Sequence, residues 1–394
     1  MTRWPMRRSR FRINWIAKND TPGPAMSVGP GLAGDHSMTR WSIERAQAWW
    51  AELGWVCGFN YLPSSAVNFL EMWHPETFDR DTISRELVWA GEAGFNAVRI
   101  NLHYLVWKHD ADGLMERLRW FVRAAADRGL GVVICPFDDC GFGGFEPVYG
   151  AQPDPVPDVH NSRAVASPGR AALLDGSEWA SFGAYVREVV GSFRDDPRVL
   201  FWDLYNEPGN RMMFSADGYG TYEPDFTPAS LRLMRDSFRW ARDEDPMQPL
   251  TVGAWVTPEP GSDADPYQTE ADRIALELSD IITFHAYWDA PHVARFIDHL
   301  AQHDRPMLCT EWMARPIGSV IDDQLDLFRE RGVGCFQWGL VQGRTQTNLP
   351  WPAELVRLHG GHADRSVWFH DLFDAEGTPY RPEEVAKIRQ VAGR

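Results

Sequence analysis

Long apolar runs, a surplus of positive charge and a cysteine framework are all missing from this sequence. No stretch of about 18 consecutive apolar residues occurs, which argues against a membrane-spanning helix. Lys and Arg number 39 against 55 Asp and Glu, and the resulting formal charge of −16 disfavours a polyphosphate partner such as nucleic acid. A neutral ligand is the simplest partner for such a surface.

The five cysteines do not indicate disulfide bonds. Four of them lie within apolar segments that we predict to be buried strands, so we expect reduced thiols inside the protein. Cys135 and Cys140 are close in sequence, but their spacing matches no strong metal-binding or redox motif.

The N-terminal segment looks unlike the rest of the chain. Its first ten residues include four arginines but are not followed by the apolar core of a secretory signal. Residues 19–37 are rich in Gly, Pro and small polar residues, and the tetrapeptide Met-Thr-Arg-Trp at 1–4 recurs at 38–41. We therefore predict a flexible, dispensable leader over 1–40, a catalytic domain over 41–394, and a cytoplasmic location.

Eight short segments rich in Val, Ile, Leu, Phe or Cys alternate with amphipathic stretches along that domain. Their length and apolarity are typical of strands that are buried on both faces of a parallel sheet. The predicted strands are WVCGFN (55–60), FNAVRIN (95–101), LGVVICPF (130–137), RVLFWDLY (198–205), PLTVGAW (249–255), DIITFHAY (280–287), RPMLCTE (305–311) and VGCFQWG (333–339).

The segments between these strands show helical periodicity. Residues 114–128 place Leu114, Leu118 and Phe121 on one face. A helix over 81–93 is predicted to begin at Asp81, a good N-cap residue. The other predicted helices span 178–194, 228–243, 291–303, 319–331 and 382–392.

Eight strands with helices after them predict an α/β fold, a single (β/α)8 TIM barrel. An open doubly wound sheet is the alternative, but no glycine-rich phosphate-binding turn follows the first strand. Four long segments follow strand ends, at 138–177, 209–227, 256–268 and 340–368. Barrel enzymes carry their active sites on the face formed by such loops, so we expect the functional site there.

Two glutamates stand at the ends of predicted strands. Glu207 closes the fourth strand in the sequence FWDLYNEP, and Glu311 closes the seventh in MLCTEW. All strand ends of a barrel meet at one mouth, and cleavage of a glycosidic bond with retention needs two carboxyl groups about 5–5.5 Å apart. The pair therefore predicts a retaining glycosidase, with Glu207 as acid/base and Glu311 as nucleophile.

Other polar and aromatic residues near strand ends fit the same pocket. Arg99 on the second strand is expected to hold the pKa of Glu311 low, and Tyr287 is expected to hydrogen-bond Glu311. His285 and Asn206 are expected to contact the sugar, Asn206 at its 2-hydroxyl. Flat faces for sugar rings are offered by Trp338 and by the loop tryptophans, of which at least half are expected to be structural. These loop residues are Trp73, Trp255, Trp288, Trp312 and Trp351.

Three further side chains follow strand ends without a definite role. Asn60 follows the first strand, and Asp138 and Asp139 follow the third. Each is predicted either to bind individual sugar hydroxyls or to tie loops together, and the sequence leaves these alternatives open.

Taken together, these motifs resemble glycoside hydrolase family 5, the cellulase family. That family has an Arg on strand two, Asn-Glu on strand four, His-x-Tyr on strand six, Glu on strand seven and Trp on strand eight, and this chain matches the pattern in order over about residues 45–390. The resemblance implies a (β/α)8 barrel that hydrolyses neutral β-linked glycosides derived from glucan, mannan or xylan, without a metal or organic cofactor. One departure is that Cys135-Pro136-Phe137-Asp138-Asp139 stands where the family often has a His.

Other functions are also compatible with a barrel. A metal-dependent hydrolase needs a His-x-His pair on an early strand, which is missing, and His359 with His362 is only a weak metal candidate. A non-catalytic carbohydrate-binding barrel would have lost one glutamate. A transglycosidase would use the same residues, so the sequence does not separate it from a hydrolase. The sizes of 138–177 and 340–368 favour a pocket for short oligosaccharides, and the oligomeric state is left open.

Overall fold

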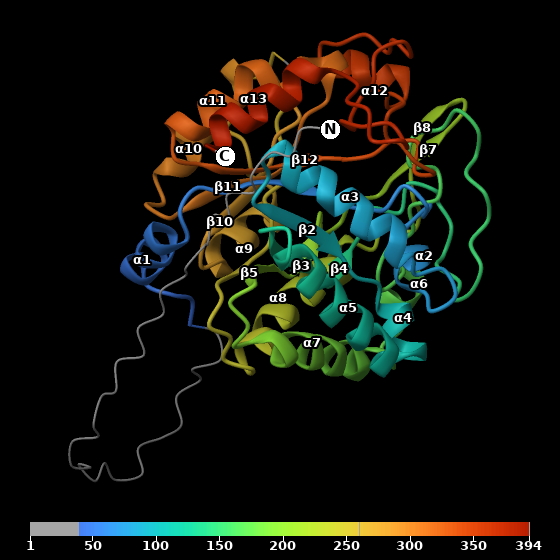
Figure 1. Cartoon of the computed structure of the whole chain (residues 1–394). Coiled ribbons are helices and arrows are strands. Elements are labelled where there is room, and N and C mark those ends of the chain that lie inside the picture. Colours follow the sequence, from blue (N-terminus) through green and yellow to red (C-terminus); the bar gives the residue numbers. More distant parts are fainter. Residues whose placement is uncertain (1–38, 260, 394) are drawn as a thin grey trace, which may run out of the picture. The chain divides into compact units, whose positions relative to one another are not determined.

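Eight parallel strands form the centre of the protein, and helices surround them (Figure 1). The computed structural model describes residues 39–259 and 261–393, so most of the predicted leader lies outside the described residues. Each of the eight predicted segments coincides with a strand of this sheet, and only the seventh strand extends beyond its segment, to Trp312. The strands are β1 (Cys57–Asn60), β2 (Ala97–Asn101), β3 (Gly131–Cys135), β5 (Val199–Asp203), β9 (Leu250–Thr251), β10 (Ile282–His285), β11 (Met307–Trp312) and β12 (Gly334–Trp338).

The sheet closes into a barrel between β9 and β10. Its strand order is β10-β11-β12-β1-β2-β3-β5-β9, which leaves these two strands at the edges of the ladder. A parallel bridge between Ala254 and Phe284 joins them: the Ala254 amide donates to the Thr283 carbonyl at 3.0 Å, and the His285 amide donates to the Ala254 carbonyl at 2.9 Å. The predicted (β/α)8 TIM barrel is therefore confirmed.

Buried side chains fill the interior of the barrel at the end opposite its mouth. Ala97, Phe201 and Phe336 belong to one buried cluster that also contacts α1 (Ile43–Leu53), a helix the sequence analysis did not predict. Because side chains alternate along a strand, Arg99 shares the inner face of β2 with Ala97. A Cβ atom on Gly58 would lie 2.5 Å from the Phe336 ring, so the packed interior requires glycine there.

The seven predicted helices are present, and all but the last differ from their predicted bounds by one to three residues at one or both ends. The helix predicted over 81–93 begins at Arg80 because Asp79, not Asp81, is the N-cap, and its side chain accepts from the Thr82 amide at 3.0 Å. The structure adds α9 (Glu270–Leu278), which begins at a capping box formed by Thr269. The predicted helices are α3 (Arg80–Ala93), α5 (Ala111–Ala126), α7 (Trp179–Phe193), α8 (Thr227–Arg242), α10 (Ala290–Ala301), α11 (Ile321–Glu330) and α13 (Pro382–Ala392).

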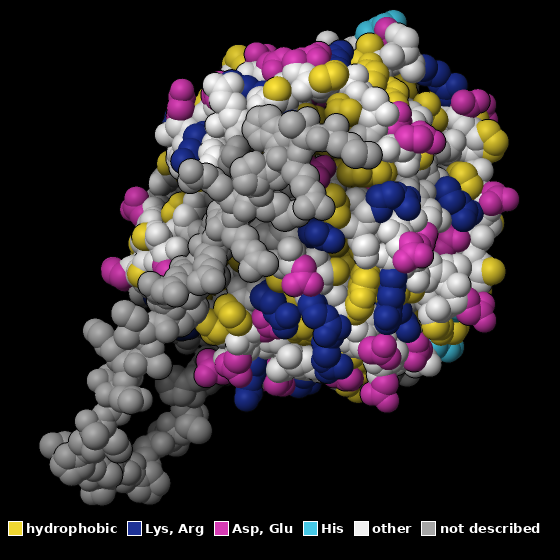
Figure 2. Space-filling model, in the orientation of Figure 1, with side chains coloured by type: hydrophobic (Ala, Val, Ile, Leu, Met, Phe, Trp, Pro, Cys, Tyr) yellow, Lys and Arg dark blue, Asp and Glu magenta, His cyan; other side chains and the backbone are white. Residues whose placement is uncertain are grey.

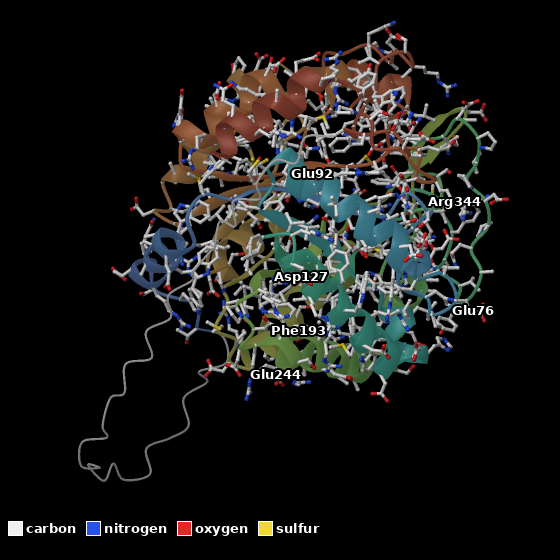
Figure 3. The ribbon with its side chains drawn as sticks, viewed as in Figure 1. Glu76, Glu92, Asp127, Phe193, Glu244 and Arg344 are labelled. Carbon is white, nitrogen blue, oxygen red and sulfur yellow. The ribbon has the colours of Figure 1, made fainter. Side chains whose placement is uncertain are left out.

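The long segments at the C-terminal ends of the strands carry secondary structure that their composition did not predict. These elements are the two-stranded pair β4 (Phe137–Asp138) and β6 (Tyr205–Asn206), the hairpin of β7 (Met212–Ser215) and β8 (Gly218–Thr221), and the helices α2 (Phe69–Trp73), α4 (Tyr104–His109), α6 (Arg170–Leu174) and α12 (Ala353–Leu358). Arg344, labelled in Figure 3, forms an ion pair of 3.3 Å with Glu71 and so ties the segment after β12 to α2.

The surface is highly charged on the face shown in Figure 2, where acidic and basic side chains are intermixed. Among the described residues, no helix is both long enough and apolar enough to span a bilayer.

Candidate active site

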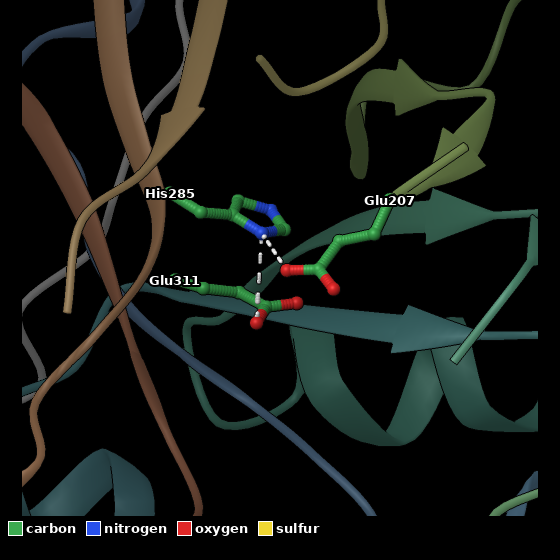
Figure 4. Close-up of side chains that lie close together, drawn as sticks. All are labelled: Glu207, His285 and Glu311. Atoms are coloured by element: carbon green, nitrogen blue, oxygen red, sulfur yellow. Dashed lines mark hydrogen bonds and ion pairs between the residues drawn. The ribbon is translucent and has the colours of Figure 1, made fainter. Parts of the chain in front are cut away.

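The two glutamates meet at the mouth of the barrel, and the imidazole of His285 lies beside both of them (Figure 4). Glu207 follows β6 and Glu311 lies on β11, whereas His285 is the last residue of β10. The Nδ1 atom of His285 lies 2.8 Å from Oε1 of Glu207 and 3.6 Å from Oε2 of Glu311. One ligand atom from each of the three side chains lies within 4.8 Å of the others. Glu207 has a positive φ of 45°, a strained backbone conformation of the kind found at functional sites.

Arg99 holds this arrangement from inside the barrel. Its side chain is fully buried, and it donates to Glu311 Oε1 at 3.1 Å, Asp203 Oδ2 at 2.8 Å, Asn60 Oδ1 at 2.7 Å and Asn206 Oδ1 at 2.6 Å. Neighbouring carboxylates raise the pKa of Arg99 despite its burial, so the guanidinium stays charged. The sequence analysis identified Arg99 but assigned no role to Asp203, which is its strongest charged partner.

Both carboxyl groups have raised pKa values. Burial raises the pKa of Glu311 to about 7, against the opposing effects of His285 and Arg99. The expectation that Arg99 holds this pKa low was therefore wrong, because the cost of desolvating the carboxylate exceeds the attraction of the cation. Burial also raises the pKa of Glu207, which Cys140 and Asn210 partly offset. Burial therefore disfavours the ionised form of both carboxyl groups.

Glu207 has two further hydrogen-bond donors that the sequence analysis did not identify. The Cys140 thiol lies 3.0 Å from Oε2 of Glu207, and the amide of Asn210 donates to the same oxygen at 2.6 Å. Burial raises the pKa of the Cys140 thiol, so the sulfur keeps its proton and donates. Both residues lie in loops, where no periodic pattern marks a side chain as facing the site.

Tyr287 lies beside Glu311, and Trp338 lies in the wall of the cavity. The Tyr287 hydroxyl donates to Glu311 Oε2 at 2.9 Å. Burial and the glutamates raise the pKa of Tyr287 well above its usual value, so this donor stays protonated. Trp338, the last residue of β12, is half-buried and lines the cavity in front of the two carboxylates.

Asn206 and the three polar residues of uncertain role are largely committed to contacts within the protein. Asn206 donates to Asp138 Oδ1 at 2.9 Å and does not line the cavity, so the structure does not place its amide at a sugar hydroxyl. Asp138 also accepts from Asn101, and Asn60 donates to the Thr310 carbonyl and accepts from Arg99. Asp138 and Asn60 nevertheless line the cavity, while Asp139 instead ties loops together through Tyr205, Gly209 and Ser230.

The cavity extends from the two glutamates across the loops on this face. Trp255, Trp288 and Trp351 line it, whereas Trp73 and Trp312 are fully buried in the core. The side chains of Glu207, His285 and Glu311 are close enough together to hold a metal ion. His359 of the weak sequence candidate is instead bonded through Nδ1 to the Leu355 carbonyl, at 2.9 Å.

Comparisons with known proteins identify the fold through structure rather than sequence. No protein-family model matches the sequence, and no curated protein matches it. A GH5_18 variant from Streptomyces cattleya, solved with Manβ1-4GlcNAc, is similar with a TM-score of 0.54 and 16% identity, over 86% of this chain and 80% of that one. An endo-1,4-β-mannanase from Rhizomucor miehei has a TM-score of 0.54 and 13% identity, over 86% and 94% of the two chains. A β-glucosidase has a TM-score of 0.54 and 13% identity, over 86% and 98%.

The barrel implied by the resemblance to glycoside hydrolase family 5 is thus the barrel of these solved structures. Because the identities are low, this likeness identifies the fold, and any statement about the reaction depends on the chain's own side chains.

Proposed function

We propose that this protein is a retaining glycosidase that cleaves neutral β-linked glycosides through a glycosyl-enzyme intermediate. The observation that carries the proposal is the close approach of Glu207 and Glu311, since one oxygen of each and the neighbouring imidazole nitrogen of His285 lie within 4.8 Å of one another. Retaining enzymes place their carboxyl groups about 5–5.5 Å apart, while inverting enzymes separate them by about 6.5–9.5 Å to admit a water molecule. The spacing here favours the retaining reaction.

In this reaction Glu311 attacks the anomeric carbon while Glu207 donates a proton to the leaving oxygen. Arg99 and Tyr287 both donate to Glu311, and such donors favour the ionised form of a carboxyl group. In the proposed reaction Glu311 therefore acts in its ionised form, and Glu207 carries the proton that the leaving oxygen takes. In the second step, Glu207 takes a proton from water, and that water releases the sugar from the ester with Glu311. These steps need no metal ion or organic cofactor.

Contact between the two longest loops, 138–177 and 340–368, favours a short substrate. The Asn161 amide donates to the Thr345 carbonyl at 2.8 Å, and the Gln346 side chain donates to the Val156 carbonyl at 2.7 Å. Residues from both loops line the cavity, so their contact walls off one side of it. A wall of this kind favours exo-acting cleavage of short oligosaccharides or glycosides over internal cuts in a polymer. The structural neighbours that act on mannan or on β-glucosides are consistent with a β-linked substrate.

Replacement of the proton donor tests the proposal. Glu207→Gln removes the acid, so hydrolysis of alkyl β-glycosides, which have poor leaving groups, should fall about 100-fold or more. Glycosylation by activated dinitrophenyl β-glycosides should change far less, because that leaving group departs without a proton. Glu92→Gln, at an exposed position on α3, is the matched control and should behave like the wild type. Equal losses on both substrates would contradict the role assigned to Glu207.

A further inference from the structure

Three histidines from the long loops line the same cavity and share one arrangement. In His160, His359 and His370, Nδ1 lies within hydrogen-bond distance of a backbone carbonyl: 2.7 Å from Leu349, 2.9 Å from Leu355 and 2.5 Å from Met313. A carbonyl oxygen only accepts, so Nδ1 carries the proton in each ring. In the neutral ring, Nε2 is then a bare acceptor.

These rings are held neutral by their surroundings. Burial lowers the pKa of His160 to about 4, and it also lowers the pKa values of His359 and His370. Unlike the Nε2 atoms of His103 and His285, those of these three rings are not among the buried unpaired polar atoms of the described residues. Because the described residues offer these Nε2 atoms no hydrogen-bond partner either, each is at least slightly exposed, and all three side chains line the cavity.

Together with Trp351, the three rings form a continuous wall near Tyr287 and Glu311. His359 and His370 both pack against Trp351, with ring centroids 5.5 and 6.2 Å away, and His160 packs against His370 at 5.3 Å. His370 and Trp351 also contact Tyr287, at 5.7 and 5.1 Å, and the Tyr287 hydroxyl donates to Glu311. Only the Tyr287 ring therefore separates this wall from Glu311, the proposed nucleophile.

The charged residues that line the cavity also favour a ligand that donates hydrogen bonds. The described residues that line the cavity include Asp138, Glu207, Glu311 and Asp371, and they include no Lys or Arg. A carboxylate or phosphate on the substrate would meet acceptors and negative charge without a cation to pair with, which carries a large desolvation cost. A sugar hydroxyl can instead donate its proton to an imidazole Nε2.

We propose that His160, His359 and His370 form a subsite that binds the hydroxyl groups of a neutral sugar as donors and excludes sugars with anionic groups. This inference rests on the proposed function and assigns the residues that recognise its neutral substrate. The subsite binds ground state and transition state alike, so its loss should raise KM more than it lowers kcat.

The test compares single His→Phe variants, which keep a ring and remove the acceptor. His370→Phe and the less buried His359→Phe should each lower kcat/KM about tenfold on the neutral aryl β-glycoside that the wild type cleaves best, mainly through KM, as expected for one lost hydrogen bond of about 1.4 kcal/mol. His362→Phe, exposed and three residues from His359, should leave kcat/KM unchanged. The wild type should cleave the matching uronide at least 100-fold more slowly.

Changes of less than twofold in both His→Phe variants with unchanged melting temperatures, or a uronide as the preferred substrate, would overturn the subsite. Calorimetric titration with neutral disaccharides (cellobiose and mannobiose) separates it from the proposed reaction. Binding that weakens in His370→Phe and His359→Phe but not in His362→Phe would support the subsite even if no glycoside were hydrolysed. Equal binding in all the variants would refute it.

Discussion

Removal of the Tyr287 hydroxyl should weaken the proposed nucleophile in a way that is visible in the pH profile. Tyr287→Phe deletes the 2.9 Å hydrogen bond to Glu311 and keeps the ring that packs on Trp351 and His370. A hydrogen bond to a charged group contributes about 1.5–3 kcal/mol. If the bond acts on the ionised form of Glu311, its loss should raise the pKa of that carboxyl by roughly one to two units.

The direction of the effect follows from the role of Glu311. Burial already raises its pKa to about 7, and the nucleophile reacts only when it is ionised. A further rise moves the acidic limb of kcat/KM to higher pH, and at pH 7 the smaller ionised fraction of Glu311 should lower kcat/KM about 5- to 50-fold. The assay is the pH dependence of kcat/KM on an activated aryl glycoside, measured between about pH 4 and pH 9.

The chain offers a matched control for this change. The Tyr222 hydroxyl also donates to a carboxylate, that of Glu146 at 3.1 Å, and Tyr222 does not line the cavity. Tyr222→Phe should leave both the pH profile and kcat/KM unchanged. An acidic limb that stays in place or moves to lower pH in Tyr287→Phe would refute the reasoning.

Two further predictions concern the acid and the stability of the barrel. Cys140→Ala removes a donor from Glu207 and so should raise its pKa, which moves the alkaline limb of kcat/KM up by as much as about one pH unit; a downward shift would rule out thiol donation. Arg315 is buried and binds Glu384 on α13 at 2.5 and 2.8 Å, so Arg315→Met should lower the free energy of unfolding in urea by about 3–5 kcal/mol; a loss below about 1 kcal/mol would show that the pair contributes little.

The sequence predicted the barrel well because each strand is an apolar segment buried on both faces. The same logic placed Glu207, His285 and Glu311 at one mouth, since they end or directly follow strands. It failed to identify Cys140, Asn210 and the histidine wall.

Those residues belong to long loops, whose path depends on contacts such as the one between Asn161 and Thr345, and no periodic pattern encodes such contacts. The sequence also did not show that the pKa of Glu311 is raised. That pKa depends on how completely the folded chain buries the carboxyl group, which the sequence alone does not reveal.

The anomeric configuration of the first product formed tests the central claim most directly. If Glu207 and Glu311 act as a pair across the scissile bond, proton NMR during early hydrolysis of a β-glycoside should show the β-anomer of the released sugar first. The α-anomer should then appear only by slow mutarotation. Initial release of the α-anomer would mean a direct attack by water and would contradict the covalent role of Glu311.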